Sequence, residues 1–223
     1  MPSPKCEQGV VVGNTYDKYG TRNPVARNLM EGFLSSFDQL VARAEPRSVL
    51  EVGCGPGDLS LRMSRQGYDV LGTDISGRMI REARKRVVDG GDKARFERID
   101  LFDLEPEAGR YDLVVCCEVL EHLNEPEEAM CHLSRLTRAH LLFSVPWEPI
   151  WRILNLARGR YWRSWGNTPG HLQHWSRQAF LDLLDTHLDV DEVRTPFPWT
   201  MALARLPAKQ PTESAPCKNG VDE

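Results

Sequence analysis

One short stretch, EVGCGPGD at 51–58, constrains the fold more than any other part of the chain. It overlaps the end of RSVLEV at 47–52, an apolar, β-branched run typical of a short strand, and it leads into the helix-like run at 58–67. Its three glycines let the backbone turn tightly and approach a ligand without an intervening Cβ. A strand, a glycine-rich turn and a helix in this order predict the first unit of a parallel α/β sheet.

Strand and helix patterns alternate through the rest of the chain. Further strands are predicted at 68–74, 94–100, 111–117 and 139–145, with late strand-like pieces at 188–196 and 200–206. Helices are predicted at 24–44, 77–88, 124–138 (with Asn124 and Glu127 as a capping box) and 177–187, where Ser176 is the N-cap. Because the strands are almost continuously apolar, we expect a Rossmann-like doubly wound, mostly parallel sheet with helices on both faces.

Composition limits the class of protein. The 223 residues, 41% hydrophobic and 27% charged, suit one globular domain, here placed at 13–206 between a flexible N-terminus (1–12) and a disordered tail (207–223). The formal net charge of −4 argues against a general nucleic-acid binder. The sequence shows no secretory signal and no apolar run near the ~20 residues that span a bilayer. These features predict a cytoplasmic protein.

Acidic residues follow three further strands, at the sheet edge where α/β proteins bind ligands. Asp74 could accept both hydroxyls of a ribose. Asp100 could accept the exocyclic amine of an adenine, with Leu101 and Phe102 on either side of the ring. Glu118 follows the fourth strand. A glycine turn or a capping acid is common by itself, but their order at four successive strand ends argues against coincidence.

These motifs resemble those of the class I S-adenosylmethionine (SAM)-dependent methyltransferases, especially the small-molecule branch with the ubiquinone and menaquinone methyltransferases. The resemblance covers about 45–146, including CCEVLEHL after the fourth strand. It implies SAM as cofactor and a seven-stranded sheet whose last strand is antiparallel. The residues that it implies at the cofactor are Glu51, Gly53, Cys54, Gly55, Gly57, Asp74, Ile75, Asp100, Leu101, Phe102, Cys117 and Glu118.

The N-terminal segment within 13–45 has two interpretations. The resemblance implies a lid that folds over the cofactor and brings Tyr16 or Tyr19 near the sulfonium, where an aromatic face favours a cation. The other interpretation is an arm with an aromatic anchor.

Two alternatives to a methyltransferase remain open from the sequence. The first is a nicotinamide-dependent Rossmann oxidoreductase. It is disfavoured because the spacing is G-x-G-x-G and Asp58 would repel a pyrophosphate at the helix start. The second is a non-catalytic subunit that keeps the SAM fold as a scaffold.

Methyl transfer is an in-line displacement at a sulfonium carbon, so the protein mainly aligns the reactants and excludes water. An oxygen nucleophile can use a general base, and the candidates are His122, His171 and His174. Each could instead be a structural loop histidine. His171 and His174 would share a face if their segment is helical, but no third ligand lies nearby in sequence, so no metal site is predicted. Glu121 is expected to be solvated or capping.

The segment 147–175 is rich in tryptophan and arginine and follows the fifth predicted strand, where the resemblance implies an insertion that covers the acceptor. The apolar stripe of this segment could simply pack against the core. Core packing does not explain its arginines, which have no acidic residue among them. Either the segment forms a pocket for a flat or greasy acceptor, or 149–165 touches anionic lipid as a peripheral membrane contact. The predicted function is methyl transfer to a small or lipid-like acceptor, at oxygen. The candidate substrate residues are Trp147, Trp151, Arg158, Tyr161, Trp162, Trp165 and Trp175.

Overall fold

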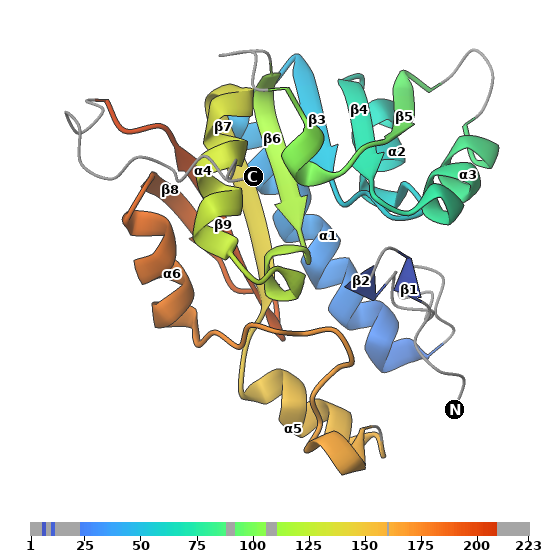
Figure 1. Ribbon diagram of the computed structural model, residues 1–223, viewed down its shortest axis with the longest axis vertical. Helices are drawn as coiled ribbons and strands as arrows, with labels where there is room; N and C mark the ends of the chain where they lie inside the picture. Colours follow the sequence, from blue (N-terminus) through green and yellow to red (C-terminus); the bar gives the residue numbers. More distant parts are fainter. Residues whose placement is uncertain are drawn as a thin grey trace, which may run out of the picture.

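A seven-stranded sheet forms the centre of the molecule (Figure 1). The computed structural model describes residues 6–7, 10–11, 23–87, 92–105, 111–159 and 161–208. The sheet strands are β3 (Ser48–Val52), β4 (Asp69–Asp74), β5 (Ala94–Arg98), β6 (Tyr111–Cys117), β7 (Thr137–Pro146), β8 (Asp189–Arg194) and β9 (Trp199–Arg205). The two-residue strands β1 (Cys6–Glu7) and β2 (Val10–Val11) pair with each other, inside the segment predicted to be flexible.

The strand order β5-β4-β3-β6-β7-β9-β8 confirms the predicted Rossmann-like fold class. The pairs β3–β4, β4–β5, β3–β6 and β6–β7 are parallel. Strand β9 is antiparallel to both of its neighbours, as the resemblance implied. The chain order reverses between β3 and β6, which makes the carboxyl ends of these two strands the topological switch point where such sheets bind ligands.

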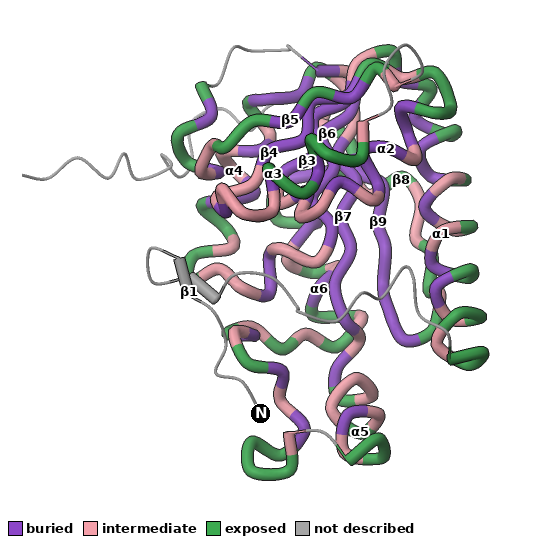
Figure 2. The backbone as a smooth tube through the Cα atoms, turned by 90° about the vertical axis from the view of Figure 1, so that its right-hand side faces the viewer, coloured by how far each residue is buried: buried purple, intermediate pink, exposed green. Residues whose placement is uncertain are grey.

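Helices cover both faces of the sheet (Figure 2). One face is packed by α1 (Pro24–Ala44), α2 (Asp58–Arg65) and α3 (Gly77–Lys85), and the other by α4 (Pro126–Leu136) and α6 (Arg177–Asp185). Phe33 and Phe37 of α1 are fully buried on the first face, as the helical spacing predicted. The strands between these two cores are therefore apolar on both sides, which explains their continuous hydrophobic runs.

The boundary between α4 and β7 differs from the prediction. The capping box is wrong: the helix begins at Pro126, and no side chain caps it. Proline is favoured at a first helical position because its missing N–H would have no helical partner there. The helix ends at Leu136, because the Thr137 hydroxyl donates to the carbonyl of Tyr111 in the neighbouring strand and fixes an extended backbone.

The segment after β7 leaves the sheet and lies beyond the carboxyl ends of the parallel strands, at the bottom of Figure 1. It contains α5 (Ile150–Ala157) and the short 3-10 helix η3 (Trp162–Ser164). Within the described part of the chain, no helix has both the length and the apolar character needed to cross a membrane.

Candidate functional site

The glycine loop after β3 adopts a backbone that only glycine tolerates well. Gly53 and Gly57 have φ of +71° and +84°, in the left-handed region that costs other residues about 1–2 kcal/mol. A Cβ on Gly53 would lie 2.3 Å from Val119 Cγ2, so this loop packs directly against the loop after β6. A Cβ on Gly55 would meet nothing within 4 Å. The loop is thus closed toward the sheet and open at Gly55, which fits a ligand lying against its backbone.

Asp74 is held beside the glycine loop by two backbone donors. Its Oδ2 accepts from the Gly55 N–H at 2.9 Å and its Oδ1 accepts from the Ser76 N–H at 2.8 Å. The carboxylate of Asp74 therefore lies against the backbone of the glycine loop, where the resemblance implied a ribose.

A hollow of about 400 Å³ lies next to Asp74. Its lining residues are Ile75, Arg98, Ile99, Asp100 and Asp103. One oxygen of Asp100 accepts from the Phe102 N–H at 3.0 Å and caps η1 (Leu101–Asp103). The Leu101 side chain is buried in the core, and the Phe102 ring lies 5.9 Å from the His132 ring. The apolar walls of the hollow therefore come from Ile75 and Ile99, and Ile99 was not singled out from the sequence.

Burial controls the protonation of three residues in the cofactor motif. Burial raises the pKa of Glu51 to about 8, an effect that the hydrogen bond from the Ser60 hydroxyl partly offsets. Burial also raises the pKa of the Cys54 and Cys117 thiols well above the ordinary value. The raised pKa values favour the neutral forms of these groups, which shape the loop and the strand end.

Glu118 follows β6 with a φ of +60°, outside the usual range for a side chain of its kind. Its Oε2 accepts from the Trp199 indole N–H at 2.9 Å and its Oε1 accepts from the Ser144 hydroxyl at 3.2 Å. Trp199 is buried and its ring centroid lies 5.6 Å from that of Trp151. Trp199 could not be singled out from the sequence, because its partners are distant along the chain.

The loop after β6, which contains η2 (Leu120–His122), is paired with the end of the insertion. The carbonyl of Glu121 accepts from the backbone N–H groups of Leu172 and Gln173 at 2.7 and 3.0 Å. The ring of His122 donates from Nδ1 to the Gly170 carbonyl at 2.8 Å. Glu121 is only 1% exposed, so the expectation that it is solvated is wrong.

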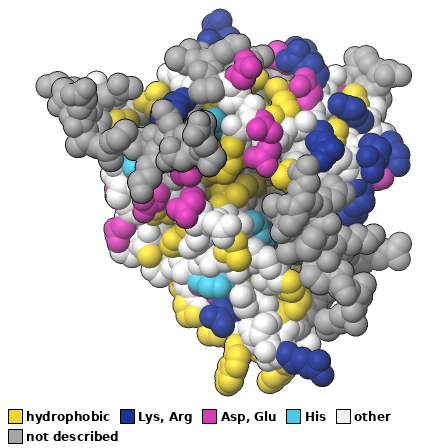
Figure 3. Space-filling model, in the orientation of Figure 1, with side chains coloured by type: hydrophobic (Ala, Val, Ile, Leu, Met, Phe, Trp, Pro, Cys, Tyr) yellow, Lys and Arg dark blue, Asp and Glu magenta, His cyan; other side chains and the backbone are white. Residues whose placement is uncertain are grey.

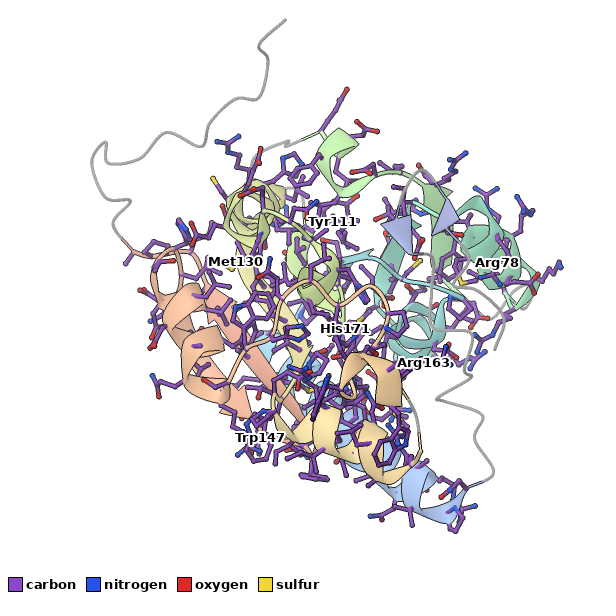
Figure 4. The ribbon with its side chains drawn as sticks, turned by 60° about the horizontal axis from the view of Figure 1, so that its bottom comes forward. Arg78, Tyr111, Met130, Trp147, Arg163 and His171 are labelled. Atoms are coloured by element: carbon purple, nitrogen blue, oxygen red, sulfur yellow. The ribbon has the colours of Figure 1, made fainter. Side chains whose placement is uncertain are left out.

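His171 and His174 do not act as a pair, because residues 171–176 are not helical. The His171 ring is buried, 4.9 Å from the His122 ring and stacked 6.5 Å from Trp151. In Figure 4 it lies near the middle of the molecule. His174 lies 3.6 Å from Glu148 at the base of the insertion, where burial raises the pKa of Glu148.

The tryptophans of the insertion, together with Trp199 of β9, form an inner and an outer set. The inner tryptophans, Trp151 and Trp199, pack against each other, and the Trp151 indole donates to the Thr168 hydroxyl at 3.0 Å. The outer tryptophans, Trp162 and Trp165, are 68% and 77% exposed. The prediction from the sequence assigned all tryptophans of 147–175 to the acceptor and did not separate them.

The remaining candidate substrate residues lie at the two ends of the insertion and between α5 and η3. Trp147 carries the Arg177 guanidinium 3.7 Å above its ring, and Trp175 packs on Phe180. Arg158 is exposed and donates to the Asn155 side chain at 2.7 Å, and Tyr161 is partly exposed at the start of η3. Tyr16 and Tyr19, with the predicted lid, lie outside the described residues.

Comparisons with known proteins agree with this geometry. A family model described as a methyltransferase domain matches residues 25–187. The chain is 28% identical over 162 residues to the ubiquinone biosynthesis O-methyltransferase of Nitrosomonas europaea, covering 66% of this chain and 69% of that protein. It is 31% identical over 160 residues to the protein of that name from Alkalilimnicola ehrlichii, covering 65% and 64%. It is 36% identical over 106 residues to that from Bordetella avium, covering 47% and 44%.

A solved structure of similar fold is magnesium protoporphyrin IX methyltransferase from Synechocystis with bound SAH, the demethylated form of the cofactor. The TM-score is 0.65 at 24% identity, with 85% of this chain and 91% of that chain covered. A second structure of that protein, with bound SAM, has a TM-score of 0.63 at 23% identity, covering 86% and 88%. The family match covers the glycine loop, Asp74, Asp100 and the loop after β6, and it favours SAM over a nicotinamide. The chain belongs to the methyltransferase domain family and is a class I SAM-dependent methyltransferase.

Proposed function

We propose that this chain transfers the methyl group of SAM to an oxygen atom of an apolar, ring-bearing acceptor. The observation that carries the proposal is the pairing of the 170–173 segment with the loop after β6. This pairing brings His122 and His171 together, and the contact between Gly53 and Val119 places their loop directly beside the glycine loop.

Aromatic side chains form one wall next to these histidines. Trp151 stacks on His171 and lies against Trp199, which is itself fixed through Glu118. Rings in such a wall favour a flat partner through offset or edge-on contacts. The wall therefore supports an acceptor with an aromatic or quinone-like ring, and the relatives named as ubiquinone biosynthesis O-methyltransferases support oxygen as the methylated atom.

His122 is the best-placed base. Because its Nδ1 donates to a carbonyl, which can only accept, Nε2 is the acceptor nitrogen of the neutral ring. When bound, SAM supplies a methyl group on a positively charged sulfur. As the acceptor oxygen bonds to the methyl carbon and the sulfur keeps the electron pair, His122 takes the hydroxyl proton and later releases it to water. The products are a methyl ether, SAH and a proton.

Matched acceptors that differ only in the nucleophilic atom test this proposal. The chain would be incubated with isotopically labelled SAM and with a prenylated phenol, a prenylated catechol, and the aniline and thiophenol of the same skeleton. Mass spectrometry should find the label as a methyl ether on the oxygen compounds. Label on nitrogen or sulfur alone, or no transfer to any of these acceptors by a chain that binds SAM, contradicts the proposal.

We also propose that the insertion contacts a lipid surface, which would deliver a lipid-linked acceptor. Ile153, which is 54% exposed, and exposed Arg163 lie in the same insertion as the outer tryptophans. Figure 3 shows hydrophobic and basic side chains together at the lower tip of the molecule. Exposed tryptophan and arginine beside apolar side chains suit an anionic membrane interface. Flotation with anionic vesicles tests the contact, and a chain that stays at the bottom of the gradient contradicts it.

A further inference from the structure

We propose that Glu121, His122 and His171 bind one divalent transition-metal ion, and that this ion holds the acceptor oxygen. Each residue offers one ligand atom, and these atoms all lie within 4.8 Å of one another. The first half of the proposal stands on this cluster alone. The second half rests on the proposed methyl transfer to oxygen.

The ligand types favour a particular class of ion. Two imidazole nitrogens and one carboxylate oxygen suit Zn²⁺, Fe²⁺, Mn²⁺ or Co²⁺, whereas Mg²⁺ and Ca²⁺ prefer ligand sets made of oxygen. An ion about 2.1 Å from each ligand holds neighbouring ligands about 3–4 Å apart. Side-chain rotations of the order of an ångström therefore close the cluster around an ion.

Contacts outside the cluster orient its ligands as metal sites require. The Gly170 carbonyl accepts from Nδ1 of His122, which leaves Nε2 as the nitrogen with a lone pair. Metal-bound histidines commonly use their second nitrogen in this way. The His171 ring is held by the stacked ring of Trp151, and the Glu121 backbone is fixed by its two bonds from 172–173.

Burial supports a positive charge at this position. Glu121 is 1% exposed and His171 is 9% exposed. Removing a carboxylate from water costs several kcal/mol unless the site supplies compensating charge or hydrogen bonds. A divalent ion supplies that charge, and it links the loop after β6 to the insertion at the point where their backbones are already paired.

Three protein ligands leave at least one position on the ion for a substrate oxygen, the arrangement found in catalytic rather than structural sites. An ion lowers the pKa of a bound hydroxyl. The acceptor hydroxyl would lose its proton to water on binding, and the resulting oxygen anion would take the methyl carbon while the sulfur keeps the electron pair. In this version His122 acts as a ligand rather than as the base.

Cobalt binding to the full chain tests the site without SAM and without an acceptor. The chain is stripped with a chelator and titrated with Co²⁺, and the visible absorption and the heat of binding are followed. We expect one bound Co²⁺ per chain, with Kd raised at least about 100-fold in Glu121→Gln, His122→Ala and His171→Ala. SAM binding by each variant shows that it is folded.

Two matched histidine variants complete the test. His174→Ala probes the pair that the sequence spacing suggested, and His187→Ala removes an exposed histidine on another element. Both should bind Co²⁺ as the unaltered chain does. Equal Co²⁺ affinity in all variants, or loss of binding in His174→Ala instead of His122→Ala, overturns the site.

The role of the ion is tested separately by turnover. Methyl transfer by the stripped chain should be at least 10-fold slower and should recover on adding Co²⁺, Mn²⁺ or Zn²⁺. If the chain binds Co²⁺ through the three residues but transfers methyl equally fast without an ion, the second half is overturned while the proposed methyl transfer stands. If no oxygen acceptor is methylated under any condition, the proposed function fails while the binding site stands.

Discussion

The proposed cofactor side, at the glycine loop and Asp74, and the proposed acceptor side, at the loop after β6 and the insertion, are built differently. On the cofactor side, Asp74 is held by the glycine loop and by Ser76, two residues further along the chain. On the acceptor side, His122 is held by Gly170, which is 48 residues away. The cofactor side is thus defined by short motifs at strand ends, and the acceptor side exists only after the insertion has folded back onto the loop after β6.

The two tryptophan sets show the same contrast within one region. The inner tryptophans are fixed by rings and hydroxyls from other segments, whereas the outer tryptophans present most of their surface to solvent. Residues of one type at one end of the domain therefore have two different environments. We expect substitutions of the inner set to affect the acceptor pocket and substitutions of the outer set to affect surface contacts.

The largest effect is expected where the two sides touch. Gly53→Ala introduces a Cβ 2.3 Å from Val119 Cγ2 at a φ of +71°, which should lower the free energy of unfolding by about 3 kcal/mol. Gly55→Ala is the matched control, because its φ of +54° is similar and its Cβ meets nothing; it should cost about 1–2 kcal/mol. Denaturant unfolding measures both.

Val119→Ala sharpens that comparison. Combined with Gly53→Ala, it removes the methyl groups that clash, so the double variant should regain part of the lost stability beyond the sum of the single effects. Equal stability of the two glycine variants would show that the glycine loop and the loop after β6 do not pack as described.

The next effect concerns the cofactor side alone. Asp74→Ala removes a carboxylate that fixes the glycine loop and that we expect to hold the ribose. Loss of charged hydrogen bonds of about 2–3 kcal/mol raises the Kd for SAM by about 30–150-fold. Asp69→Ala, at the opposite end of the same strand, is the control. Calorimetry that finds equal SAM affinity in both variants rules out this assignment.

Much of the cofactor side could be predicted from the sequence because its signals are local. The glycine spacing, Asp74 and Asp100 each follow a recognisable strand. The adenine walls proposed at Leu101 and Phe102 stay a prediction: both residues sit on η1, whose turn directs Leu101 into the core and Phe102 toward His132.

The acceptor side could not be predicted to the same extent. Glu121 carries no local sign that 172–173 will cover it, and the histidine spacing of 171 and 174 suggested a helical pair that the extended backbone separates. Trp199 reaches Glu118 from the other end of the domain. Such contacts depend on sheet order, which periodicity does not encode.

A smaller effect is expected at the outer tryptophans. Replacing both Trp162 and Trp165 by Ser removes apolar area that is already exposed, so the melting temperature and SAM affinity should stay unchanged. Partitioning onto anionic vesicles should fall about 10-fold or more, because each buried apolar side chain contributes about 1.5–3 kcal/mol. Vesicle flotation measures this, and zwitterionic vesicles provide the comparison. Unchanged partitioning would remove the contrast between inner and outer sets.

The last effect is a pH dependence on the proposed cofactor side. The pKa of Glu51 is about 8 in the folded chain, above its ordinary value of 4.5. Between these values the unfolded chain loses a proton that the folded chain keeps, so stability falls as pH rises from about 4.5 to about 8. Glu51→Gln has no proton to lose. Its melting temperature should gain roughly 10 °C on the unaltered chain between pH 5 and pH 8; a constant difference contradicts the raised pKa.

We expect the two sides to meet at His122. The most direct measurement is the kcat for methyl transfer to a catechol-type acceptor by His122→Ala, with the Kd for SAM determined on the same sample and His187→Ala as control. We predict a kcat at least about 100-fold lower in His122→Ala, with SAM affinity unchanged and the control fully active. A His122→Ala chain that turns over at the rate of the unaltered chain, or that fails because it no longer binds SAM, would contradict the claim.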